Sequence, residues 1–329
     1  MVRTRAYSMK FILIGTVLLV GVVFAAGKFY LYYKVSDGVD SAVLAMSPYA
    51  EIEYGGISST ITGELTVDDL KVKIKGYRDG FSIGRLGIDT PNFLTLLSLS
   101  DLAAGTPSAS SGAPEYFGFI AEDMRIQTTA DYYTDFYEAS IKKLAPADIR
   151  QRGVQCVGKY GYSPKALKAL GYDEIIVSMT VGLRQGESNF ITEMKIDAVD
   201  MLNLDMNMQI AGNLMSGVAS GPYYRPKMSD LTLKITDQSL NARVEKYCTR
   251  LGLTPAQILA ARLNSLQYRG KLNGIEFDEY VIDPYKEYLA GKSTLIVTAK
   301  PREPLDLARI EKYKPSDVPA LLNLEAVAQ

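Results

Sequence analysis

The sequence contains no histidine, no tryptophan and only two cysteines. Without histidine there is no Ser-His-Asp or Cys-His catalysis, and no metal site that needs imidazole. Two cysteines are too few for a zinc ribbon or an iron–sulfur cluster. The net charge of −1 provides no general basic field for nucleic acid. The sequence therefore predicts no catalytic residue, no metal ligand, no cofactor and no nucleic-acid partner.

The N-terminal 34 residues are basic and apolar, with five Lys or Arg and no acidic residue, which leaves residues 35–329 with a net charge of −6. Residues 11–33 contain one charge, Lys28, and as a helix they would be about 34 Å long, enough to cross a hydrocarbon core of about 30 Å. Four aromatic residues near the end of this segment are typical of a membrane-interface belt: Phe29, Tyr30, Tyr32 and Tyr33. We expect a transmembrane signal-anchor at 11–33.

The charges around this span predict its orientation. Arg3, Arg5 and Lys10 precede the span, and Lys28 and Lys34 follow its uncharged run. The positive-inside rule therefore favours a cytoplasmic tail at residues 1–10. A cleaved signal peptide is the alternative, because Ala25 and Ala26 suit signal peptidase. Both interpretations send residues 35–329 across the membrane. We expect a single-pass protein of a bacterial inner membrane with the bulk of the chain in the periplasm.

The exported part divides by composition into a β-rich region at 34–104, a flexible loop at 105–115 and an α+β region at 116–329. The loop is small, polar and broken by Pro and Gly. The fold class expected is α+β, in which an N-terminal transmembrane helix is followed by a curved, mainly antiparallel β-sheet with several packed helices.

Local signals place some elements. Apolar residues change from odd to even positions at Asp68-Asp69, which predicts a β-bulge or a tight bend. Ser163-Pro164 is typical of a helix start, and Thr254 to Gln257 has the spacing of a capping box. Asp283-Pro284 predicts the start of another helix.

The clearest period-2 alternation runs from 175 to 210 and predicts a three-stranded antiparallel meander with one apolar face. That face has two interpretations, a core sealed by helices or an open trough for an acyl chain, where methionine offers adaptable contacts. The lipid-facing candidates are Val177, Met179, Val181, Met194, Ile196, Leu204, Met206 and Met208.

Residues 57–74 follow closely on the N-terminal span and carry a Gly-x-Leu-x-Val-x-Asp-Leu pattern, formed by Gly63, Leu65, Val67, Asp69 and Leu70. This pattern resembles the start of AsmA-like bacterial envelope proteins. Later segments, at 170–172, 237–240 and 288–297, resemble a group of proteobacterial periplasmic proteins of unknown function. The resemblance implies an envelope protein tied to lipid movement along a β-lined groove. AsmA-like proteins are generally much longer, so a short groove of this kind would not span the periplasm.

The two cysteines, Cys156 and Cys248, form an even count in an exported chain, which predicts a disulfide. The alternative is two free thiols, because Cys248 lies on the apolar side of its predicted helix, where a small hydrophobic residue suffices.

The leading functional expectation is a non-enzymatic envelope component that binds a membrane lipid or another envelope protein. A carboxylate-dependent hydrolase of envelope glycan or lipid is one alternative, with Asp68-Asp69, Asp131 with Asp135, and Asp197 with Asp200 as candidate pairs. A structural or assembly factor is the other. An open apolar groove would favour the first, converging carboxylates the second and a large exposed apolar patch the third.

Overall fold

The structure is a computed structural model. It describes residues 36, 39–41, 43–60, 62–96, 115–144, 163–212, 227–306, 309 and 312–329. The predicted span at 11–33, its aromatic belt (Phe29, Tyr30, Tyr32 and Tyr33) and most of the 105–115 loop lie outside these residues. Among the described helices, none combines the length and the apolar character that crossing a membrane requires.

The described residues form one 12-stranded antiparallel sheet. Its order is β1-β3-β4-β5-β6-β7-β8-β9-β10-β12, with β2 beside β3 and β11 beside β9. The strands are β1 (Ala50–Glu53), β2 (Gly56–Ser59), β3 (Glu64–Ile74), β4 (Gly80–Asp89), β5 (Tyr116–Gln127), β6 (Glu174–Gln185), β7 (Asn189–Ala198), β8 (Leu202–Ala211), β9 (Lys227–Asp237), β10 (Thr294–Ala299), β11 (Leu305–Asp306) and β12 (Leu324–Ala328). Since β4 pairs with β5, the 34–104 and 116–329 regions share this sheet.

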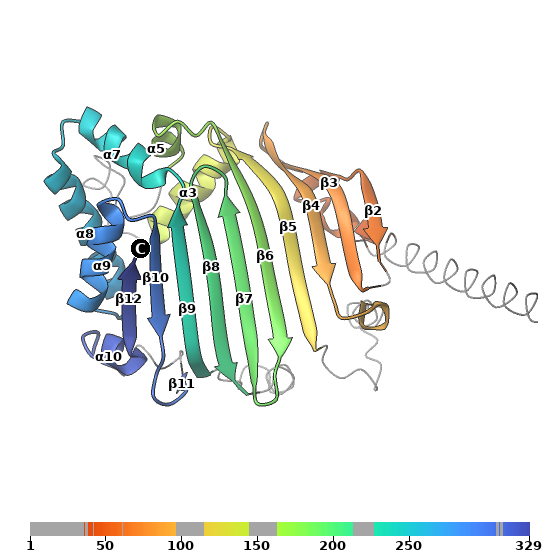
Figure 1. Ribbon diagram of the computed structural model, residues 1–329. Coiled ribbons are helices and arrows are strands. Elements are labelled where there is room, and N and C mark those ends of the chain that lie inside the picture. The colour runs from red at the N-terminus through yellow and green to blue at the C-terminus, as the bar shows by residue number, and fades with distance from the viewer. Residues whose placement is uncertain are drawn as a thin grey trace, which may run out of the picture.

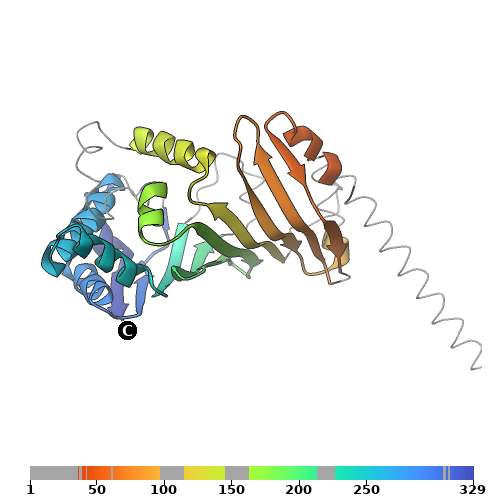
Figure 2. The same ribbon diagram turned by 90° about the horizontal axis from the view of Figure 1, so that it is seen from above.

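The helices alongside the sheet include α3 (Asp131–Leu144), α5 (Pro164–Ala169), α7 (Leu240–Arg250), α8 (Pro255–Leu272), α9 (Glu279–Leu289) and α10 (Val318–Leu322). The expected α+β class, with a mainly antiparallel sheet and several helices, is confirmed. Figure 2 shows that the sheet is curved and that α3 and α5 lie on the inner side of the curve. The α7–α9 group lies at the β10–β12 end (Figure 1).

Two of the predicted helix starts are confirmed by their caps. The Ser163 side chain accepts a hydrogen bond from the Ala166 backbone N–H, with Pro164 in the first turn of α5. Thr254 and Gln257 form the reciprocal capping box of α8. The start predicted at Asp283-Pro284 is wrong, because α9 begins at Glu279 and Pro284 lies inside it.

The change of apolar positions at Asp68-Asp69 corresponds to a local change of backbone conformation. Asp69 has φ of +53°, which confirms the expected bend. Asp123 on β5 has φ of +54°, and the register between β5 and β6 shifts between Ala121 and Met124. At Asp123 the extra residue of β5 keeps the apolar side chains before and after it on the same face of the sheet, whereas the β3–β4 register is the same on both sides of Asp69.

A glycine stands beside each of these aspartates, Gly84 on β4 beside Asp123 and Gly55 between β1 and β2 beside Asp69. A Cβ built on Gly84 of β4 would lie 3.0 Å from the Cβ of Asp123, and one on Gly55 would lie 3.1 Å from the Cβ of Asp69. These contacts are tight, so glycine makes room for the left-handed residue next to it. The bend therefore continues across β3, β4 and β5 as one feature.

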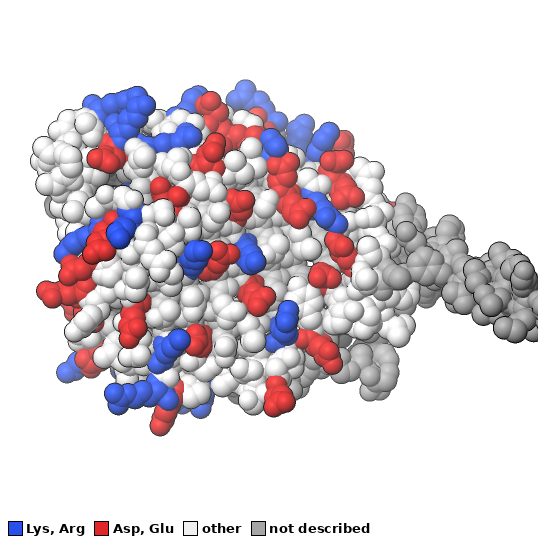
Figure 3. Space-filling view, in the orientation of Figure 1, with Lys and Arg blue, Asp and Glu red and all other residues white. Residues whose placement is uncertain are grey.

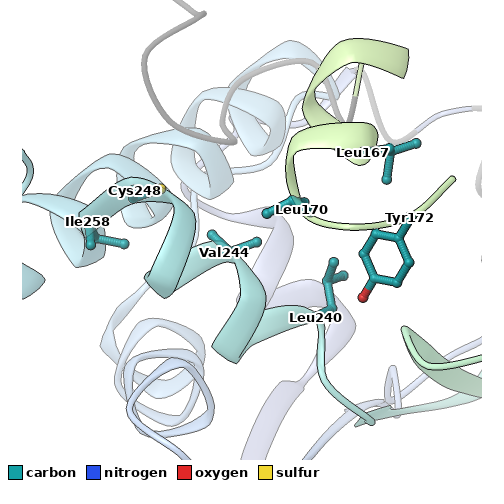
Figure 4. Packing of buried hydrophobic residues seen from close by; sticks show 7 residues of the cluster. All are labelled: Leu167, Leu170, Tyr172, Leu240, Val244, Cys248 and Ile258. Atoms are coloured by element: carbon teal, nitrogen blue, oxygen red, sulfur yellow. The ribbon is translucent and has the colours of Figure 1, made fainter. Parts of the chain in front are cut away.

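Three clusters of buried residues pack against the sheet. The first joins α5, α7 and α8 (Figure 4). It contacts Ile175 and Leu202 of the sheet. The second joins α10 with β9 and β10 and contacts Met208. The third is centred on Leu96 and contacts β3 and β4. The buried members are, in the first cluster, Leu167, Leu170, Tyr172, Leu240, Val244, Cys248 and Ile258 and, in the second, Met228, Ala299, Val318 and Leu322.

Candidate functional site: the apolar face of the sheet

The eight lipid-facing candidates lie on one face of three neighbouring strands. Met179 of β6 stands opposite Ile196 of β7, and Val181 stands opposite Met194. Met194 in turn stands opposite Met206 of β8. Directly opposed residues of an antiparallel sheet point to the same side, so the predicted meander and its single apolar face are what the register produces.

The face extends beyond the meander onto β9. Leu231, Leu233 and Ile235 stand opposite Met208, Met206 and Leu204. Their period-2 alternation was a usable sequence signal, but sequence reasoning did not connect that strand to the face. β8 and β9 are separated in the sequence by residues 213–226, and their pairing in the sheet places the three β9 residues on this face. We call the eight candidates together with Leu231, Leu233 and Ile235 the apolar face.

Packing against the buried clusters distinguishes the ends of this face from its middle. All eight candidates are half-buried, as are the three residues from β9. Met208 and Leu231 pack against the second cluster, so this end of the face is covered. At the other end Ile175 and Leu202 pack against α5 and α7. Between these ends Met179, Met194 and Met206 belong to none of the three clusters of buried residues in the described part of the chain.

The chemistry of the face is uniform. From β6 to β9 its central residues are Val, Met, Ile and Leu, without a charged or aromatic side chain. The strands that carry it are 10 to 12 residues long, and the face itself runs over five residues of β6, β8 and β9, about 13–17 Å. Methionine side chains are unbranched and polarizable and adjust to irregular apolar surfaces. The arrangement can hold an extended apolar ligand by contact alone.

The opposite face is polar and carries ion pairs. Arg85 contacts Glu64 at 2.6 Å and Glu122 at 3.7 Å, and Arg125 contacts Asp123 at 2.9 Å. Figure 3 shows this side of the sheet, where both signs of charge are interspersed. A recess of about 410 Å³ on this part of the molecule is also lined by residues of both signs, including Glu51 and Lys71. Contact with solvent is normal for the polar face, which carries charged side chains. It is unusual for the apolar face, whose side chains are aliphatic.

Of the carboxylate pairs considered for hydrolysis, both members of the Asp131–Asp135 pair have structural partners. Asp131 contacts Arg78 at 3.4 Å, and Asp135 accepts a hydrogen bond from the Tyr77 hydroxyl at 3.0 Å. That hydrogen bond is the main reason why the pKa of Tyr77 is raised. Asp200 has φ of +57° in the turn between β7 and β8. Within the described part of the chain, no group of three or more carboxylates or cysteines is placed to hold a metal ion.

A partly buried carboxyl, that of Asp237, links α7 to the sheet. Burial raises the pKa of the Asp237 carboxyl, and Asp237 accepts a hydrogen bond from the Asn241 backbone N–H. Arg262 donates to the Asn241 side chain at 2.7 Å. Burial also raises the pKa of nearby Tyr288 to about 12, so this phenol stays neutral. These contacts join β9, α7, α8 and α9, a structural role.

Cys248 is fully buried in the first cluster and is engaged in a disulfide. Cys156 lies outside the described residues, so the pairing of the two remains a prediction. We expect mass mapping of the unreduced protein to find Cys156 joined to Cys248, with a mobility difference between reducing and non-reducing gels. Such a bond closes a loop of about 93 residues, for which chain entropy gives somewhat over 4 kcal/mol. Alkylation of both thiols in denatured, unreduced protein would contradict the pairing.

Comparison with known proteins gives one match. A family model described as "Uncharacterized protein" matches residues 194–329, which run from β7 to β12. No curated protein matches the chain. The pattern from Gly63 to Leu70 lies outside the matched range, so the resemblance to AsmA-like proteins remains a prediction.

Proposed function

We propose that this protein is a membrane-anchored envelope component that binds the acyl chain of a lipid on its apolar face. The observation that carries the proposal is the half-burial of Met179, Met194 and Met206 in the middle of a continuous apolar surface. An apolar surface that keeps part of its area in contact with solvent favours a binding role. Leaving it in water costs about 25 cal/mol for each Å² that a ligand could cover.

The composition of the face favours an acyl chain over a protein partner. Protein interfaces concentrate their binding energy in Trp, Tyr and Arg. The centre of this face has none of these residues and consists of flexible or branched aliphatic side chains. A ligand without polar groups of its own needs no hydrogen-bonding partner there, and the face offers none.

The location of the protein is part of the proposal. The apolar run at 11–33 and the basic residues before it support a single span with a cytoplasmic N-terminus and a periplasmic body. An anchor of this kind would keep the apolar face close to a source of lipid. The lipid-binding part of the proposal holds whether or not the span is cleaved after export, whereas the anchor requires an uncleaved span.

The proposal is tested on full-length protein recovered from the membrane fraction with a mild detergent. Mass spectrometry of an organic extract is expected to find lipid at close to one molecule per chain, above the amount carried by a membrane protein of similar span. Protein that is folded and free of lipid would contradict the binding function. Recovery of the full-length chain only in the soluble fraction would contradict the anchor.

A further inference from the structure

A second candidate binding site lies where α5 and α7 meet. A recess of about 280 Å³ opens between the end of α5 and one side of α7. Its lining consists of Ala169, Leu170, Gly171, Arg243, Lys246, Tyr247 and Arg250. The charged side chains of this lining are Arg243, Lys246 and Arg250, and all three are cationic. We call it the α5–α7 recess.

The spacing of the cations on α7 brings them to one side of the helix. Arg243, Lys246 and Arg250 are at positions i, i+3 and i+7, which share a face. Lys246 and Arg250 are exposed. Neither makes an ion pair or a side-chain hydrogen bond with another residue of the described ranges, in contrast to Arg85 and Arg125 on the sheet. Three positive charges without a carboxylate in the same recess repel one another unless an anion lies between them.

Arg243 is held in a fixed orientation. Its guanidinium lies 4.4 Å from the centre of the Tyr172 ring. Nε donates to the Ser239 hydroxyl at 3.0 Å, and Nη1 donates to the carbonyl oxygen of Gly171 at 3.2 Å. Burial raises the pKa of Tyr172, which keeps this ring neutral under the cation.

These contacts leave part of the guanidinium for a ligand. Arginine has five N–H donors, and the two on Nη2 of Arg243 have no partner within the described part of the chain. A planar guanidinium that is already oriented loses little entropy when it binds an oxyanion. Gly171, with φ of +87°, keeps the space beside Nη1 open, because a Cβ there would lie 3.3 Å from that atom.

We propose that the α5–α7 recess binds a phosphate group through Arg243, Lys246 and Arg250. Tetrahedral oxyanions are the ligands that combined arginine and lysine sites favour, since arginine supplies directed N–H groups and lysine a mobile charge. The phosphate is either free inorganic phosphate or the phosphate of a lipid headgroup. This inference goes beyond the proposed acyl-chain binding and does not rest on it.

The test uses full-length protein in a neutral detergent and two soluble probes, inorganic phosphate and dihexanoyl phosphatidic acid. Binding is measured by isothermal titration calorimetry at low and at moderate salt. The double variant Lys246→Gln/Arg250→Gln is expected to lose at least tenfold in affinity for any probe that the natural protein binds. The affinity of the natural protein is expected to fall as the salt concentration rises, because the charges of Lys246 and Arg250 are exposed to solvent.

A matched control removes the same charge elsewhere. Lys195→Gln/Lys234→Gln lies on the polar face of the sheet, where both side chains are exposed. It is expected to bind as the natural protein does. Equal losses of affinity in both double variants would mean a general charge effect and would overturn the proposal. The proposal would also be overturned if neither probe bound to the natural protein.

The probes separate the two sources of phosphate. Binding of inorganic phosphate that is lost in Lys246→Gln/Arg250→Gln assigns the recess to the free anion. Binding of phosphatidic acid alone, with the same loss, assigns it to a lipid headgroup. The site is also separable from the apolar face, because Met206→Glu changes no residue of the recess and is expected to leave binding of the probe phosphate intact.

Discussion

A Met206→Glu variant is expected to fold and to lose lipid. Met206 lies in the centre of the apolar face, between Met194 and Leu233 on the neighbouring strands. Because its side chain is half-buried, a carboxylate there keeps contact with water, and the cost to stability is about 1 kcal/mol. A bound acyl chain would remove that water. The penalty for an unpaired polar group, about 1–3 kcal/mol in mutational data, then corresponds to a loss of roughly 5-fold to 150-fold in affinity.

Thermal melting and lipid extraction on the same preparation separate the possible results. Thr180→Glu is the matched control, since Thr180 is exposed on the polar face and stands opposite Lys195. It is expected to keep both stability and lipid. A collapse of the melting temperature in Met206→Glu would mean that the face is a sealed core, where a buried carboxylate costs several kcal/mol. A folded Met206→Glu protein that still carries lipid would place the ligand elsewhere.

A Gly63→Ala variant is expected to be severely destabilised. Gly63 has φ of +99°, and a Cβ there would lie 2.5 Å from the carbonyl oxygen of Thr90. Thr90 is buried, and both its backbone N–H and its hydroxyl donate to the carbonyl of Gly63. Left-handed backbone costs an alanine about 1–2 kcal/mol, and overpacking against fixed atoms adds about 1–3 kcal/mol. The expected loss is therefore roughly 2–5 kcal/mol, a large part of a typical total of about 5–15 kcal/mol.

Gly76→Ala isolates the contribution of the close contact. Gly76 has a similar φ of +90°, but no atom lies within 4 Å of a Cβ built there. This variant pays the backbone strain alone and is expected to lose about 1–2 kcal/mol. The free energies of unfolding are compared by urea denaturation, and Gly63→Ala should be the less stable of the two. Equal losses would show that the contact with Thr90 relaxes without cost.

The AsmA-like pattern from 63 to 70 has a local physical explanation in this fold. Gly63 allows the approach of Thr90, Leu65 packs in the cluster around Leu96, and Asp69 supplies the left-handed residue of the bend. A strand pair with this geometry favours these residue types whatever the protein binds. The pattern is therefore explained by the local structure, and the AsmA-like resemblance remains a prediction.

Sequence signals with a local physical cause predicted well. Caps at Ser163 and Thr254 depend on side chains within three residues, so they are visible in the sequence. The helix start at Asp283-Pro284 failed because buried Val281 and Ile282 extend α9 toward its N-terminus. Packing against the sheet outweighed the preference of proline for the first turn. The bend at Asp123 was missed, although the same change of parity that marks Asp69 occurs in 117–126.

The sequence by itself determined the strands of the meander and which of their residues share a face, because a two-residue period assigns each side chain to one side of a sheet. It also determined the basic, apolar character of the N-terminus. Only the tertiary structure decided that Met206 is half-buried while Val244 is sealed, since both are apolar residues in regular elements and differ in what packs over them. The α5–α7 recess likewise exists only after folding, because Gly171 and Arg243 are distant in the chain and are brought together by the cluster around Tyr172 and Leu240.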